Sequence, residues 1–194
     1  MRTPIGSLLL AAALSLPAFA GPKELNGYLS GGVSMQNWHG QARIGSAQLE
    51  LVWNSKRVER WISHTEIGTT AILSDVDQPR EWDPYHLGAA TNQVKALGLE
   101  LYARHLWRTG SNRAQPFLEI GSGPMWSMRE VPATTSHINF QSQFAIGAVL
   151  FPQSKTPLRI GWRFFHISNG VIAERNPGLN VNSFYIGTRV ASFR

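Results

Sequence analysis

Residues 157–169 read PLRIGWRFFHISN, and their apolar and polar side chains alternate one by one. The even positions from Leu158 to Phe164 are apolar, while Arg159 and Arg163 stand at odd positions. Successive side chains of a β-strand point to opposite faces of the sheet. The stretch therefore predicts a strand with one apolar face and one polar face.

The same alternation recurs along the chain, and turn-forming residues separate the repeats. We predict eight strands, at residues 24–36, 42–53, 57–73, 94–107, 115–127, 138–151, 157–169 and 182–193. Short turns follow the second, fourth and sixth of them, and the longer segments 74–93, 128–137 and 170–181 follow the third, fifth and seventh. Outer-membrane barrels have short periplasmic turns and longer extracellular loops. The pattern predicts an all-β fold, an eight-stranded antiparallel transmembrane β-barrel.

Alternation alone fits two kinds of barrel. A soluble, lipocalin-like barrel turns its apolar set inward and its charges toward water. A membrane barrel turns its apolar set toward lipid, so that charges of both signs meet and pair in the narrow lumen. Seven tryptophans and a charged fraction of only 15% suit the aromatic girdles of a membrane barrel, which we favour.

The first twenty residues are expected to be a secretory signal peptide. Arg2 supplies a positive start, residues 7–16 form a short apolar run, and Ala18-Phe19-Ala20 has the small-x-small form of a cleavage site. We therefore expect residues 21–194 to form one barrel domain in the bacterial outer membrane.

The formal net charge of +6 does not indicate nucleic-acid binding, because the basic residues are interleaved with acidic and aromatic ones rather than gathered in runs. The excess positive charge instead favours contact with an anionic surface such as a phosphorylated lipid. The histidines lack metal-ligand spacing, so neither a metal nor a cofactor is expected.

His166 and Ser168 are the candidate reactive residues. They are two positions apart near a strand end, so both point to the face that carries the apolar residues of that strand. Polar groups on a lipid face have no ordinary structural use and cost free energy unless they are paired, so their presence there points to function. An imidazole can accept the proton of a serine hydroxyl and so make it a nucleophile. Asn169 or the backbone amide of Gly170 can donate to the oxyanion that follows.

The region around these residues resembles the lipid A 3-O-deacylases of the PagL type, whose seventh strand ends in a His-x-Ser-Asn run. Residues 115–123, QPFLEIGSG, resemble the P-F-x-E-x-G-x-G stretch of the family's fifth strand, and residues 139–147 resemble the next strand. The resemblance covers the C-terminal half closely and the N-terminal half by pattern alone.

The resemblance implies an eight-stranded outer-membrane enzyme with Ser168 as nucleophile, His166 as base and Asn169 as oxyanion donor. The third member of the family's triad is a glutamate at the start of the last strand, and this chain has Asn180 there. Asparagine can orient an imidazole but cannot stabilise imidazolium as a carboxylate does. Glu174, in the preceding loop, is the alternative third member.

We therefore expect a carboxylic ester hydrolase that removes the 3-O-linked acyl chain of lipid A in lipopolysaccharide. Two other functions remain open at this point. The chain can be a non-catalytic structural or adhesive barrel with a degenerate site, or a soluble lipocalin-like lipid binder. The sequence leaves the oligomeric state open between a monomer and a homodimer.

Overall fold

The computed structural model describes residues 21–35, 42–53, 56–79, 91–110 and 112–193. The predicted signal peptide, residues 1–20, lies outside the described residues.

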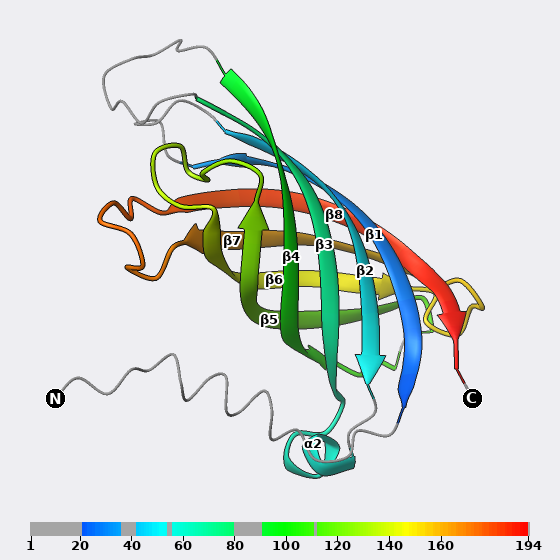
Figure 1. Cartoon of the computed structure of the whole chain (residues 1–194). Coiled ribbons are helices and arrows are strands. Elements are labelled where there is room, and N and C mark those ends of the chain that lie inside the picture. Colours follow the sequence, from blue (N-terminus) through cyan, green and yellow to red (C-terminus); the bar gives the residue numbers. More distant parts are fainter. Residues whose placement is uncertain (1–20, 36–41, 54–55, 80–90, 111, 194) are drawn as a thin grey trace, which may run out of the picture.

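Eight antiparallel strands close into a single barrel, in which each strand pairs with the next and β8 returns to β1 (Figure 1). The strands are β1 Pro22–Ser34, β2 Arg43–Trp53, β3 Thr65–Pro79, β4 Thr91–Leu106, β5 Ala114–Ser127, β6 Ile138–Leu150, β7 Leu158–Ser168 and β8 Leu179–Ser192. A short helix, α2 Lys56–Trp61, lies between β2 and β3. The predicted eight-stranded barrel is confirmed.

The prediction was wrong in two places along β3 and β4. The expected strand 57–73 begins later, at Thr65, because residues Lys56–Trp61 form α2. The expected loop 74–93 is shorter, because β3 continues to Pro79 and β4 already begins at Thr91. Here the backbone ladder continues after the apolar alternation has stopped.

The barrel has its polar residues inside and its apolar residues outside. Charged and amide side chains are buried in the lumen: Glu24, Gln48, Glu50, Glu100, Arg104, Glu119, Arg159 and Arg163. Large apolar side chains are exposed on the outer face: Leu29, Leu49, Leu73, Leu97, Leu99, Ile120, Ile146, Ile160, Phe184 and Ile186. A soluble binder would show the reverse arrangement, so the lipocalin-like alternative is wrong. No helix in the described ranges is long and apolar enough to cross a bilayer.

Arg104 lies at the centre of the luminal charges. Its guanidinium lies 2.5 Å from a carboxylate oxygen of Glu50 and 2.6 Å from one of Glu119. Glu66 contributes a third carboxylate at 3.4 Å. Because both charges of each close pair are buried, each compensates the desolvation of the other. The network links the four neighbouring strands β2, β3, β4 and β5 on the inner face of the barrel.

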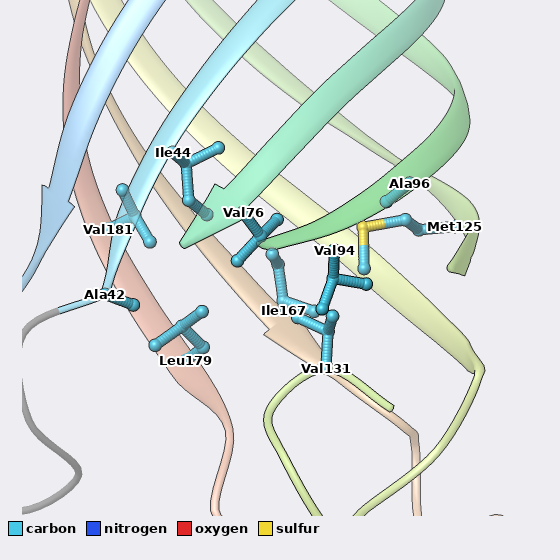
Figure 2. Close-up of a cluster of buried hydrophobic side chains, with 10 residues drawn as sticks. All are labelled: Ala42, Ile44, Val76, Val94, Ala96, Met125, Val131, Ile167, Leu179 and Val181. Atoms are coloured by element: carbon cyan, nitrogen blue, oxygen red, sulfur yellow. The ribbon is translucent and has the colours of Figure 1, made fainter. Parts of the chain in front are cut away.

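The lumen is apolar at the end where the longer loops lie. Figure 2 shows the cluster that fills it: Ala42, Ile44, Val76, Val94, Ala96, Met125, Val131, Ile167, Leu179 and Val181. Val131 comes from the loop between β5 and β6, and the other members come from the strands or, for Ala42, from the residue before β2. The packing fixes the last residues of β7 and the first of β8, which position the candidate site.

Candidate functional site

His166 and Ser168 lie on the outward face of β7. The residue between them, Ile167, is only 1% exposed and points into the apolar cluster (Figure 2). Because side chains alternate along a strand, burying Ile167 turns both of its neighbours toward the outside of the barrel. The structure therefore brings an imidazole and a hydroxyl to the same face as Ile160 and Trp162.

Asn180 is the cross-strand partner of His166. The register of β7 and β8 pairs the two residues directly, and Asn180 also points outward because Leu179 and Val181 are buried. The imidazole Nδ1 lies 2.6 Å from Asn180 Oδ1. An amide oxygen can only accept, so Nδ1–H is the donor and Nε2 keeps its lone pair. This hydrogen bond selects the tautomer in which Nε2 can act as a base.

Gly178 packs against the other side of the site. Its φ of +68° is in the left-handed region, and a Cβ added there would lie 2.7 Å from His166 Cε1. Both the backbone conformation and the close approach favour glycine. The imidazole is thus confined between the Gly178 backbone and its hydrogen bond to Asn180.

Ser168 is partly buried and lies opposite Phe140 of β6. Among the described residues, no hydrogen bond joins its hydroxyl to His166. Two residues of extended strand separate the two Cα atoms by about 6.6 Å, so rotation of the two side chains can bring Oγ and Nε2 together. Catalytic hydrogen bonds are often open in ligand-free enzymes and close around substrate.

Asn169 organises the loop that follows Ser168. Its side chain is 1% exposed, donates from Nδ2 to the carbonyl oxygen of Arg175 at 2.7 Å, and accepts from the N–H of Val171 at 3.0 Å. Its own N–H donates to Asn176 Oδ1 at 3.1 Å. These contacts hold the side chain in the loop, away from the outward face of Ser168. The Gly170 N–H has no hydrogen-bond partner in the part of the chain that is described.

Glu174 is exposed in the same loop and forms no ion pair within the described ranges. Of the two alternatives for a third member, Asn180 contacts His166 and Glu174 does not.

The strand register gives the depth of the site along the barrel. Starting from Lys95 on β4 and stepping from each residue to its opposite partner on the next strand, one turn around the barrel returns to β4 ten residues further on, at His105. The path runs through Lys95, Asp75, Gly45, Gly31, Phe184, Trp162, Ile146, Leu118 and His105. Ten residues over eight strands is a descent of 1.25 residues per strand. The path reaches β7 at Trp162 after five strands, so Trp162 lies about six residues lower than Lys95. Since β7 runs upward, the residue of β7 at the height of Lys95 is about six positions after Trp162, at Ser168.

Ser168 is therefore level with a band of outward charges on the far strands. Arg43, Asp75 and Lys95 are exposed there, and Lys95 lies 3.6 Å from Asp75. Below this band, most of the exposed outward residues of the same strands are leucine or alanine, which suit lipid tails: Ala47, Leu49, Ala71, Leu73, Leu97, Leu99 and Leu101. The candidate site thus lies at the upper edge of the apolar belt, where a bilayer changes from hydrocarbon to polar headgroups.

Several residues at the site were not predicted from the sequence. Gly178, Asn176 and Phe140 contact or border the candidate residues, yet none carries a reactive group. The Asn176-Pro177-Gly178 run predicts a turn, but only the packing shows that this turn touches His166.

Comparisons with known proteins point to one family. The family model described as lipid A 3-O-deacylase (PagL) matches residues 31–189. The crystal structure of the outer membrane enzyme PagL is similar, with a TM-score of 0.61 and 14% sequence identity, covering 84% of this chain and 97% of that one.

A second similar crystal structure is that of Neisserial surface protein A, with a TM-score of 0.61 and 10% identity, covering 87% of this chain and 96% of that one. No curated protein matches the sequence. At these identities, the two structures support the fold alone.

Proposed function

We propose that this chain, which belongs to the lipid A 3-O-deacylase (PagL) family, is an outer-membrane serine esterase that hydrolyses the 3-O-linked acyl ester of lipid A. One observation carries the proposal. The 2.6 Å contact of His166 Nδ1 with Asn180 leaves the lone pair of Nε2 available on the outward face of β7, which also carries Ser168.

In the first step, Ser168 Oγ attacks the carbonyl carbon of the ester and its proton passes to His166 Nε2. The bond to the sugar oxygen then breaks, and this oxygen takes the proton from His166. Water, activated by His166 in the same way, attacks the acyl-serine and releases the 3-hydroxy fatty acid. Ser168 is regenerated, and the reaction needs no cofactor.

The Gly170 N–H is the better candidate for the oxyanion donor, with Asn169 in a positioning role. The sequence offered both residues for this task. The backbone N–H and the side chain of Asn169 already form hydrogen bonds within the loop. The N–H of Gly170, two residues after Ser168, forms no hydrogen bond with the described residues and can donate to an oxyanion. A preorganised backbone donor stabilises developing negative charge effectively.

The depth of the site fits the proposed substrate. An acyl ester of lipid A lies where fatty chains join the glucosamine headgroup, at the boundary between hydrocarbon and polar regions. Ser168 is level with the outward charges of Arg43 and Lys95, at the corresponding boundary of the barrel. The substrate can therefore reach Ser168 by lateral diffusion in the outer leaflet.

The test is a mass spectrum of lipid A incubated with the purified barrel in detergent. We expect the mass to fall by one 3-hydroxyacyl group. Ser168→Ala is expected to abolish this loss, whereas Ser142→Ala, which changes the outward serine opposite His166 on β6, is expected to leave it unchanged. Full activity in Ser168→Ala would refute the proposed nucleophile.

A non-catalytic barrel is the second candidate function, and the asparagine at position 180 favours it. Asn180→Glu separates the two, because a carboxylate stabilises the imidazolium that an amide does not. An enzyme slowed by Asn180 should gain at least about tenfold in rate. If lipid A is unchanged by the wild type and by this variant, the barrel is non-catalytic.

A homodimer stays a prediction, to be tested by light scattering.

A further inference from the structure

The loop after Ser168 begins with a tight turn of unusual composition. The N–H of Ile172 donates to the carbonyl oxygen of Asn169 at 3.1 Å, and the two central residues, Gly170 and Val171, have φ values of +61° and +68°. These features define a type I′ turn. Both of its central positions ordinarily take glycine, asparagine or aspartate.

Val171 is strained at this position. A β-branched side chain in the left-handed region is a steric outlier, and such outliers cluster at functional sites. A hydrogen bond stabilises this backbone conformation of Val171, whose N–H donates to Asn169 Oδ1 at 3.0 Å. The result is the exposure of two aliphatic side chains, since Val171 is 81% and Ile172 is 62% exposed.

The turn packs against an outward-facing residue of the barrel. A Cβ added to Gly170 would lie 3.4 Å from the ring of Phe140, the residue that pairs with Ser168 across β6 and β7. Phe140 and its neighbour Ile138 are themselves exposed outward. The turn that carries the exposed Val171 and Ile172 therefore lies against Phe140, next to Ser168 and at the top of the apolar belt. We call Phe140, Val171 and Ile172 the acyl platform.

We propose that the acyl platform binds the half of the fatty chain nearest the carbonyl, a stretch longer than a four-carbon acyl group, in the ester that Ser168 cleaves. The inference rests on the proposed function. A carbonyl placed at Ser168 has its sugar oxygen toward the headgroups, so its chain must leave along an adjoining apolar surface. Phe140 pairs with Ser168 and faces lipid, and Gly170 brings the turn with Val171 and Ile172 against it. Its contact favours long chains and holds the carbonyl at Oγ, so Val171 and Ile172 determine acyl-length specificity.

The first test compares two esters. The substrates are N-acylated glucosamines that carry either a butanoyl or a tetradecanoyl ester at O3. Combining Val171→Asn with Ile172→Ser keeps a residue that tolerates positive φ and removes the apolar surface. We expect kcat/KM for the long ester to fall about tenfold, with the short ester changed less than about twofold.

Met128→Ser is the matched control, because Met128 is 61% exposed at the same end of the barrel on the β5–β6 loop. It should leave both esters unaffected. An equal fall for both esters in the double variant, or no fall, would overturn the proposal.

The second test does not require turnover and so separates this proposal from the proposed function. The probe is a glucosamine with a tetradecanoyl amide at position 3 and a photoreactive diazirine close to the carbonyl. Irradiation of the wild-type barrel should crosslink Phe140, Val171 or Ile172, as mapped by peptide mass. Crosslinks confined to other strands would refute the acyl platform, even if the barrel cleaves lipid A. If crosslinks form at the acyl platform but no ester is cleaved, the proposed function fails and the acyl platform stands as a lipid-binding site.

Discussion

His166 is held from two directions. Asn180 fixes its Nδ1 at 2.6 Å, and the Gly178 backbone confines the ring edge that carries Cε1. The arrangement orients the imidazole before substrate arrives, which is a condition for efficient acyl transfer. Gly178, which has no reactive group, therefore takes part in positioning the imidazole.

Gly178→Ala tests this orientation. The added methyl group would lie 2.7 Å from His166 Cε1, so the ring must move and the bond to Asn180 should weaken. We expect kcat to fall at least about tenfold with little change in KM. Gly110→Ala is the control, because Gly110 has the same φ of +68° but open space around its Cβ position. If both variants slow the enzyme equally, backbone strain and not the imidazole is responsible.

Residue spacing alone predicted that His166 and Ser168 share a face, because alternation in a strand is a local property. The partner of His166 was harder to identify, since Asn180 and Glu174 were both candidates. Cross-strand register depends on how β7 and β8 align, and this alignment is set by the burial of Ile167, Leu179 and Val181. The contact with Gly178 lies beyond any sequence pattern.

At the scale of elements, the strands were predictable where one face meets lipid. β6 and β7 begin and end within one residue of their predicted bounds. At their upper ends β3 and β4 extend further than predicted, to Pro79 and from Thr91, because these ends lie beyond the apolar belt, near and above the level of the exposed Asp75–Lys95 pair. There the hydrogen-bonded ladder continues while the apolar alternation is lost. α2 was missed because a six-residue helix, less than two turns long, shows too little periodicity to be recognised.

The conformation of the β7–β8 loop depends on the side chain of Asn169. Asn169→Ala tests whether this residue acts by ordering the loop. The variant removes the bonds to Arg175 and Val171, each of which contributes about 1 kcal/mol. We expect faster hydrogen exchange at the amides of Val171 and Ile172, together with a lower kcat. The control is Thr109→Ala, which removes a 2.9 Å side-chain bond to Ala114 at the opposite end. Slower catalysis with unchanged exchange would indicate that Asn169 acts on the substrate directly.

The whole molecule is a rigid support for a site on its outer surface. Buried charges join the strands in the middle of the lumen, and the apolar cluster closes the end at which the site lies. Both regions lie inside the barrel, away from the outward face that carries the site. Together they keep the outward faces of β6, β7 and β8 in a fixed relation.

Arg104→Met tests the luminal network. The change leaves Glu50 and Glu119 buried without their closest cation, which should destabilise the barrel by roughly 3–5 kcal/mol. The urea midpoint of the barrel in lipid vesicles, followed by tryptophan fluorescence, measures this loss. Lys95→Met breaks only the exposed pair with Asp75 and should cost less than about 1 kcal/mol. Equal midpoints for the two variants would show that the network adds no stability.

The central claim is that Ser168 is a nucleophile on the outside of the barrel, activated by His166. A long-chain alkyl fluorophosphonate, which reacts covalently with activated serines, tests it directly in the folded protein. We predict a single adduct that peptide mass spectrometry assigns to Ser168, and no adduct in His166→Ala. An adduct on another serine, or unchanged labelling without His166, would contradict the account.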